Sequence, residues 1–172
     1  MLQVDLGELA RKKRVQIDES LPANHPLLAG AGFRLVGPLD LHLQVQEATH
    51  DVVVLGRMEG ESEVPCRRCL VPVRTPIDQE VTLLFRAGVT QVDAEAEEIY
   101  PLPARGDELD LSGAIREHLL LAVPDFVECQ EACRGLCPHC GVNLNETTCS
   151  CERTNVDERW SALRKLATKT KD

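Results

Sequence analysis

The stretch CRGLCPHCGVNLNETTCSC, residues 133–151, contains five of the eight cysteines of this 172-residue chain. The eight occur as four close pairs: Cys66 and Cys69, Cys129 and Cys133, Cys137 and Cys140, and Cys149 and Cys151. A turn of two to four residues can direct two sulfur atoms at one ion, and two such turns complete a tetrahedron around zinc. The four pairs therefore predict two zinc sites with four cysteine ligands each, and two Zn²⁺ ions per chain.

Chain geometry indicates which pairs share an ion. Pro138 rigidifies the CPHC turn, Gly141 permits a positive φ, and a short connection leads to the C-x-C pair. This arrangement predicts a local zinc knuckle formed by Cys137, Cys140, Cys149 and Cys151. By elimination, Cys66 and Cys69 would share the second ion with Cys129 and Cys133. A crossed arrangement, in which Cys133 joins the knuckle and Cys129 is unused, fits the spacing as well. His139 is interpreted as solvated, because its side chain would point away from a metal held by its neighbours.

The N-terminal stretch, MLQVDLGELARKKRVQIDES, has acidic residues early and no apolar core of a signal peptide. The longest apolar runs are far shorter than the roughly 20 residues that cross a bilayer. We therefore expect a cytoplasmic protein, with no membrane partner. In a reducing compartment, eight cysteines favour metal binding, redox chemistry or simple burial over a disulfide framework.

The CRRC motif at residues 66–69 tests the redox interpretation. A thioredoxin-like C-x-x-C opens a helix, whose N-terminal amides lower the pKa of the first thiol. Here LVPVRTPID follows, with Pro72 and Pro76 and several β-branched residues, and predicts an extended segment. A thiol–disulfide role is therefore disfavoured. The spacings also match neither common ferredoxin pattern.

Several segments have the period-two pattern of half-buried strands. LDLHLQVQ, Leu39 to Gln46, alternates apolar and polar residues, and residues 47–64 predict a turn near Thr49 to Asp51 followed by a return strand. A further strand is expected at Ile77 to Arg86, with Pro72 and Pro76 at an edge or bend. Sequential strands with short turns predict an antiparallel sheet. The acidic stretch GVTQVDAEAEE, residues 88–98, is expected to be a solvated loop.

Two segments have helical patterns. DLSGAIREHLLLAVP, residues 110–124, carries one apolar stripe, Asp110 or Ser112 can cap its start and Pro124 ends it. The stripe comprises Leu111, Ala114, Ile115, His118, Leu119 and Ala122, and His118 is interpreted as a hydrogen-bonded boundary residue. VDERWSALRKLATKTKD, residues 156–172, predicts a second helix with a narrow apolar face and Asp157 as its cap.

These elements predict an α+β protein, an antiparallel β-sheet with packing helices and a Cys-rich zinc-bound C-terminal region. Residues 1–128 would form a mixed α/β domain that contains the sheet, the CxxC turn and the amphipathic helix. Residues 129–172 would form a Cys-rich zinc-knuckle segment with a C-terminal helix. Because this segment has few apolar residues, the metal would be what fixes its fold.

Four segments carry a resemblance to a known family: VPCRRCLVPV, DLSGAIREHLLLAVP, CRGLCPHCGVNLNETTCSC and DERWSALRKL. Their order and spacing resemble the YceD family, the large ribosomal RNA subunit accumulation proteins of bacteria and plastids. One departure is Glu158, which stands where a proline is usual before the arginine. The resemblance implies a role in accumulation of large-subunit ribosomal RNA, in ribosome assembly, without established catalysis. Family members can lack the knuckle and retain the C-x-x-C, which agrees with two separable sites.

The formal net charge of −9 argues against a nonspecific RNA-coating role, because phosphate affinity requires clustered Lys and Arg. Basic groups occur locally, at Arg11 to Arg14, Arg67 and Arg68, Arg134 and along the C-terminal segment. Arg67, Arg68 and Arg134 could equally offset the charge of a four-thiolate zinc centre. Direct RNA contact stays open, and a basic ribosomal protein or assembly factor suits the acidic surface of this protein better.

No phosphate-binding loop, nucleophile elbow or H-E-x-x-H motif is present in the sequence, so no enzymatic activity and no small-molecule substrate are expected. A four-cysteine zinc site has no open position for a catalytic water. Two rival functions remain from other classes. One is a redox-sensing zinc switch whose thiols oxidise and release metal. The other is a transcription-linked zinc-ribbon adaptor, which copurification with RNA polymerase would favour.

Overall fold

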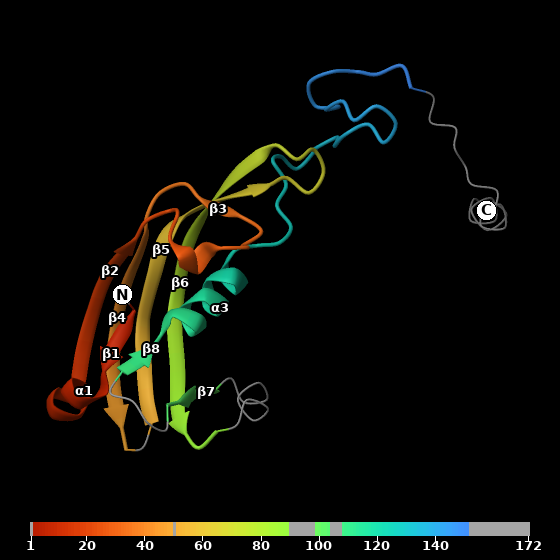
Figure 1. The fold of residues 1–172 in the computed structure, drawn as a ribbon. Coiled ribbons are helices and arrows are strands. Elements are labelled where there is room, and N and C mark those ends of the chain that lie inside the picture. Colours follow the sequence, from red (N-terminus) through yellow and green to blue (C-terminus); the bar gives the residue numbers. More distant parts are fainter. Residues whose placement is uncertain (1, 50, 90–98, 104–107, 152–172) are drawn as a thin grey trace, which may run out of the picture.

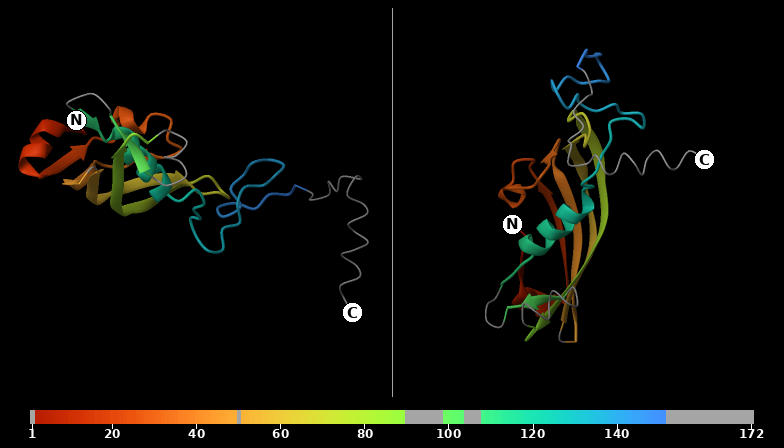
Figure 2. Two further views of the ribbon diagram at one scale, coloured as in Figure 1. Left: turned by 90° about the horizontal axis from the view of Figure 1, so that it is seen from below. Right: turned by 90° about the vertical axis from the view of Figure 1, so that its right-hand side faces the viewer.

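The computed structural model describes residues 2–49, 51–89, 99–103 and 108–151. Its largest element is a curved sheet with a helix across one face (Figure 1). The Cys-rich segment lies beyond one end of the longest strands, away from that helix. The views in Figure 2 show the same separation from two other directions.

The main sheet has six strands, of which five follow one another from edge to edge. In this order they are β2 (Arg14–Leu21), β4 (Leu39–Ala48), β5 (Asp51–Pro65), β6 (Pro72–Ala87) and β7 (Ile99–Leu102), while β3 (Arg34–Leu35) pairs with β5. The β5–β6 pair is the longest, with a register that runs from Asp51 opposite Arg86 to Pro65 opposite Pro72. The strands predicted from residue 39, residue 51 and residue 77 are therefore confirmed, and β6 begins earlier than expected.

The expectation of a purely antiparallel sheet is wrong in one respect. β7 runs parallel to the end of β6, with Leu84 opposite Ile99 and Ala87 opposite Leu102. A parallel partner requires a connection much longer than a hairpin turn, and the residues between Ala87 and Ile99 supply that length. The sheet is thus mixed. Among the described strands, β6 has no partner on this side before Leu84, which agrees with the edge position predicted from its prolines.

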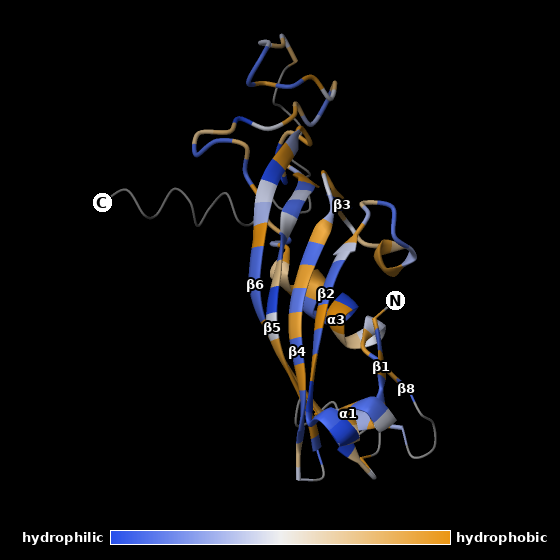
Figure 3. Cartoon of the chain, turned by 90° about the vertical axis from the view of Figure 1, so that its left-hand side faces the viewer, coloured by the Kyte–Doolittle hydropathy of each residue, from blue (hydrophilic) through white to orange (hydrophobic). Residues whose placement is uncertain are grey.

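Alternation along the strands separates a buried face from a polar face. On β4, Leu39, Leu41, Leu43 and Val45 are buried, and the residues between them are half-buried or exposed. Figure 3 shows this alternation as successive orange and blue bands along the strands. Since successive side chains of a strand point to opposite faces, one face of the sheet carries the core and the other faces solvent.

The helix α3 (Ser112–Ala122) covers the apolar face of the sheet (Figure 1). Leu111, Ala114, Ile115 and Leu119 are buried, which confirms the predicted apolar stripe. The remaining stripe positions, His118 and Ala122, are half-buried. Of the two proposed caps, the Asp110 carboxylate accepts a hydrogen bond from the Ser112 N–H at 2.8 Å.

The N-terminal residues complete this cover, and sequence analysis assigned no element to them. β1 (Gln3–Asp5) pairs with β8 (Glu108–Asp110) in a small two-stranded sheet. It leads into α1 (Leu6–Lys12), where the Asp5 carboxylate accepts a hydrogen bond from the Glu8 N–H at 2.7 Å. Together with the short 3₁₀ helix η1 (Pro26–Leu28), these elements add the buried Leu9 and Leu27 to the core.

The β5–β6 hairpin extends past its neighbours and ends in the CRRC turn. β3 is opposite Ser62 and Glu63, so beyond this point β5 pairs only with β6 among the described strands. The Cys-rich residues 129–151 pack at this tip and contain no helix or strand, only an isolated bridge between Leu136 and Asn143. The cysteine pairs therefore lie at one end of the molecule, on irregular backbone.

Two predicted elements lie outside the described residues. They are the acidic stretch from residue 90 to residue 98 and the C-terminal helix with its cap Asp157. The basic groups of that C-terminal segment lie outside them as well. Within the part of the chain that is described, no helix is long and apolar enough to cross a membrane.

Candidate metal centres

The eight sulfur atoms lie in two groups of four, and within each group all sulfurs are within 4.8 Å of one another. The first group, here called the hairpin quartet, is Cys66, Cys69, Cys129 and Cys133. The second, the knuckle quartet, is Cys137, Cys140, Cys149 and Cys151. The structure thus brings together the same sets that the spacing predicts. The crossed alternative is not adopted, because the Sγ of Cys133 lies 3.9 Å from that of Cys66.

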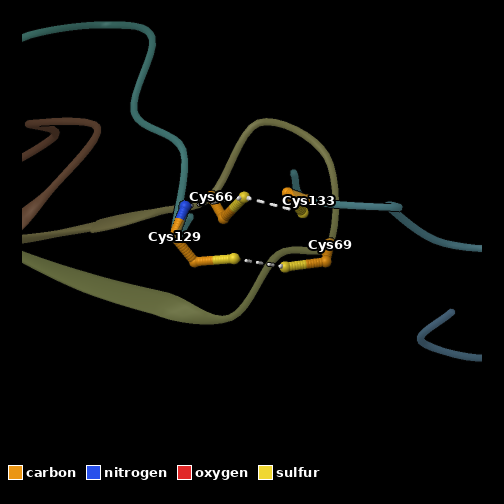
Figure 4. A group of neighbouring side chains, drawn as sticks. All are labelled: Cys66, Cys69, Cys129 and Cys133. Carbon is orange, nitrogen blue, oxygen red and sulfur yellow. Dashed lines mark hydrogen bonds between the residues drawn. The ribbon is translucent and has the colours of Figure 1, made fainter. Parts of the chain in front are cut away.

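The hairpin quartet joins two distant parts of the chain (Figure 4). Cys66 and Cys69 come from the turn between β5 and β6, and Cys129 and Cys133 from the segment after α3. The Sγ atoms of Cys69 and Cys129 are 3.5 Å apart. Cys66, Cys69 and Cys133 are buried, and Val71, Val73 and Leu136 pack against them. The site is therefore shielded from solvent on most sides.

Backbone contacts hold the segment before Cys129 against the hairpin. The N–H of Arg67 donates to the carbonyl of Val127 at 2.9 Å. The guanidinium of Arg67 also pairs with the carboxylate of Glu128, with Nε 2.8 Å from Oε1. These two contacts place Cys129 beside the CRRC turn. Arg67 thus has a local partner, so its charge is already offset by a carboxylate.

The two C-x-x-C turns share one backbone conformation. The N–H of Leu70 donates to the carbonyl of Cys66 at 2.9 Å, and the N–H of Gly141 donates to that of Cys137 at 2.9 Å. The donor residue is left-handed in both turns, with φ of 62° at Leu70 and 73° at Gly141. The positive φ predicted for Gly141 is confirmed. Leu70 adopts this conformation without the freedom of glycine, at a cost of about 1–2 kcal/mol.

The same turns direct backbone N–H groups at their first sulfur. Burial raises the pKa of the Cys66 thiol, but hydrogen bonds from the backbones of Arg68, Cys69 and Cys129 outweigh burial and lower that pKa to about 6. The N–H of Cys129 lies 3.4 Å from this sulfur. In the knuckle, backbone hydrogen bonds from Cys140 and His139 lower the pKa of Cys137 to about 6. Each turn therefore stabilises one thiolate.

Other thiols of each quartet are shifted the other way. The neighbouring Cys69 side chain and burial raise the pKa of Cys129 to about 12. The Cys140 side chain and burial raise the pKa of Cys151 to about 12. Without a cation, each quartet thus holds protons between crowded sulfurs. A divalent cation would replace those protons and neutralise the thiolates.

The sulfur spacing fits a tetrahedral ion and not a disulfide. Zinc–sulfur bonds of about 2.3 Å place neighbouring sulfurs about 3.8 Å apart in a tetrahedron. The printed spacings of 3.5 and 3.9 Å in the hairpin quartet lie close to this value. A disulfide would require about 2.05 Å. Four thiolates around each centre are a donor set that suits a structural zinc ion with no open coordination position.

Comparison with known proteins places this geometry in a family. The family model for the large ribosomal RNA subunit accumulation protein YceD matches residues 54–167, which include all eight cysteines. The chain belongs to the YceD family. The resemblance stated from the sequence motifs is therefore confirmed.

Relatives match over different shares of this YceD-family chain. An uncharacterized protein of Mycobacterium tuberculosis is 28% identical over 165 residues, covering 94% of this chain and 79% of the relative. YlbN of Bacillus subtilis is 25% identical over 156 residues, covering 90% and 89%. An Arabidopsis thaliana protein named large ribosomal RNA subunit accumulation protein YCED homolog 1, chloroplastic, is 36% identical over 64 residues, covering 37% and 20%. No solved structure matches the chain.

Sequence reasoning assigned no role to three residues that support the quartets. Glu128 pairs with Arg67, Gly135 lies against the CRRC turn, and Asn145 contacts the sulfur of Cys133. Gly135 and Asn145 stand at the two ends of the motif GLCPHCGVNLN. A glycine before the first knuckle cysteine and an asparagine in a short loop are signals for close backbone approach and side-chain bonding.

Proposed function

We propose that this YceD-family chain is a noncatalytic zinc-binding factor that supports accumulation of large-subunit ribosomal RNA during ribosome biogenesis. The family match and the printed name of the Arabidopsis relative support the biological role. The observation that carries the biochemical part is the pair of quartets, each with four sulfurs within 4.8 Å. The eight cysteines would be the metal ligands.

The ions would act as cross-links and not as catalysts. In the hairpin quartet, Cys66 and Cys69 would hold the ion from the sheet, and Cys129 and Cys133 from the C-terminal segment. In the knuckle quartet the ion would close a local loop. A bound zinc ion supplies folding free energy to such a segment. The sequence-based division into residues 1–128 and 129–172 remains part of this proposal.

Charge supports a protein partner over bare RNA as the direct contact. In the N-terminal basic run, Lys12 pairs with Glu8 and Lys13 with Glu47. Arg67 pairs with Glu128. Since these cations already have carboxylate partners, the described surface offers few clustered charges for phosphate. A basic ribosomal protein or assembly factor in the cytoplasm would match the acidic chain. The plant relatives carry chloroplastic names.

The first experiment measures metal content and free thiols on protein purified without chelator or added metal. We expect about two zinc ions per chain and thiols that react only after chelation. Protein with no metal and with reactive or disulfide-linked cysteines would reject the zinc sites. Rapid, reversible zinc loss in mild peroxide with changed activity would move the function to a redox switch.

The second experiment tests the biological role in a deletion strain. The strain is complemented with the wild type, with Cys66→Ser plus Cys69→Ser, and with Ser150→Ala as a control between two ligands that is not itself a ligand. Large-subunit RNA precursors should accumulate without the gene and with the double cysteine variant, and disappear with the other two. Normal RNA profiles in the deletion strain, or copurification with RNA polymerase alone, would reject the proposed role.

A further inference from the structure

Asn145 belongs to the knuckle loop but contacts the other quartet. Its Nδ2 donates a hydrogen bond to the Sγ of Cys133 at 3.4 Å. Its Oδ1 accepts one from the N–H of Arg134 at 2.7 Å and one from Nε2 of Gln130 at 3.2 Å. The side chain of Asn145 therefore grips the backbone and the sulfur of a hairpin-quartet residue from a loop that lies between two knuckle cysteines.

Backbone contacts hold the same two segments together. The N–H of Leu144 donates to the carbonyl of Gly135 at 2.9 Å, and Leu136 forms a bridge with Asn143. On its other side, the N–H of Leu136 donates to the carbonyl of Arg68 at 3.0 Å, inside the CRRC turn. Residues 133–136 thus lie between the hairpin turn and the knuckle loop, and both quartets contribute to their position.

We propose that Asn145 is a positioning residue that couples the two quartets. Metal binding by the knuckle quartet fixes the loop from residue 141 to residue 148, and this loop then holds the Asn145 amide against the sulfur of Cys133. The hairpin quartet consequently binds its ion more tightly when the knuckle quartet is loaded. This inference rests on the proposed zinc binding and adds a dependence between the two sites.

Two physical reasons support this direction. An N–H donor aimed at sulfur stabilises the thiolate form, which is the form that binds metal, and it fixes the sulfur in place. In addition, Leu144 is the single buried residue of the knuckle loop, at 9% exposure, so apolar packing contributes little to holding the loop. The ion would supply most of what orders Asn145. By linkage, the hairpin ion strengthens binding at the knuckle by the same factor.

The test measures Co²⁺ affinity of the full chain by the visible absorption of tetrahedral cobalt–thiolate sites. Asn145→Asp keeps the shape of the side chain and replaces the N–H donor by a carboxylate oxygen that faces the sulfur. Thr147→Asp adds the same charge to an exposed position of the same loop. Each substitution is made in the wild type and in a chain that lacks the knuckle site through Cys137→Ser and Cys140→Ser.

We expect Asn145→Asp to lower the affinity of the hairpin quartet by about 10–100-fold, and Thr147→Asp to leave it within a few-fold of the wild type. In the chain without the knuckle site, hairpin affinity should already be reduced, and Asn145→Asp should lower it little further. This non-additivity is the mark of coupling through one residue. Hydrogen exchange of β4 and β5 checks that every variant keeps its sheet.

Three results would overturn the inference. The first is equal hairpin affinity in the Asn145→Asp and Thr147→Asp variants. The second is a loss from Asn145→Asp that is the same with and without the knuckle site, because Asn145 would then act on Cys133 alone. In both cases two ions still bind, and the proposed zinc function stands. The third is a wild-type chain that binds no cobalt or zinc at all, which rejects the inference and the proposed metal sites together.

Discussion

The sheet and the Cys-rich end of this molecule are held together by different means. The sheet buries a continuous set of aliphatic side chains, such as Leu41, Val54 and Leu83, under α3 and the N-terminal elements. At the Cys-rich end the buried side chains are chiefly sulfurs, Cys66, Cys69 and Cys133. Alternating strands supply an apolar face over a long distance, whereas residues 129–151 have no regular element that could do so.

The difference teaches where each part obtains its stability. Burial of aliphatic area contributes roughly 25 cal/mol per Å², and the sheet has that area. The Cys-rich end requires cross-links, and structural zinc contributes apparent folding free energies of about 10–16 kcal/mol in small zinc-dependent units. The two parts should therefore respond to different perturbations, and the following predictions can break or sharpen this contrast.

Metal removal should have the largest effect and confine it to the Cys-rich end. After chelation, we expect backbone amides of residues 129–151 to lose protection from hydrogen exchange, because few apolar contacts remain to hold them. Amides of β4 and β5 should keep most of their protection. Exchange measured before and after chelation, and again after zinc is restored, checks both halves of the prediction. Unfolding of the sheet on chelation would show that the two parts are one cooperative unit.

A core truncation should produce the opposite pattern. Leu41 is fully buried on β4, and Leu41→Ala should lower the free energy of unfolding of the sheet by about 2–5 kcal/mol, because it leaves a cavity. Leu55→Ala is the matched control, since Leu55 is 38% exposed on β5 and should cost far less. Both should be measured by denaturant unfolding, together with zinc content. A loss of bound zinc in the folded Leu41→Ala protein would contradict the separation.

The contact between the two parts can be tested at Gly135. This residue has a φ of 75°, and a Cβ there would lie 3.0 Å from the carbonyl oxygen of Arg68. Gly135→Ala should cost about 1–2 kcal/mol in backbone strain and push the CRRC turn away, so that zinc leaves the hairpin quartet faster. Gly141→Ala carries the same strain, with φ of 73°, but meets open space. Chelator-competition rates for both variants should differ. Equal rates would show that the close approach to Arg68 has no effect on the metal.

Strands β4 and β5, helix α3 and the composition of both quartets could be predicted from the sequence because each depends on local spacing. Alternation at Leu39 to Val45 and the stripe from Leu111 to Leu119 record burial directly in the residue order. The quartets follow from paired cysteines, and the long-range pairing followed by elimination. Their role as metal ligands stays a prediction.

The rest depends on contacts that residue order does not record. The parallel pairing of β7 is a matter of where a long connection returns the chain, and β1 is held in place by β8 from a distant part of the sequence. The hydrogen bond from Asn145 to Cys133 requires the knuckle loop to fold back over its own first residues. Leu70 shows a further limit, because a left-handed turn position is expected to be glycine and here is leucine.

The smallest predicted effect concerns His42 on the polar face of the sheet. Its Nδ1 lies 2.8 Å from Oδ1 of Asp18 on β2, and this hydrogen bond raises the pKa of His42 above its usual 6.5. A raised pKa means that the folded state favours the protonated ring. The contribution to stability is therefore complete below the unfolded pKa and is lost as the pH rises through the folded pKa. Asp18→Asn should bring the pKa of His42 down, as measured by NMR titration.

The same change in pH should act in opposite directions on the two parts of the molecule. As the pH falls toward the pKa of His42, the sheet gains the His42–Asp18 interaction, while protons compete with metal for the thiolates of the quartets. Mild acid should thus release zinc and expose residues 129–151 before the sheet loses any protection. Asp18→Asn should remove the gain in the sheet and leave the zinc-release curve unchanged. If acid unfolded the sheet at the pH of zinc release, the quartets would be supporting the whole fold and not only the Cys-rich end.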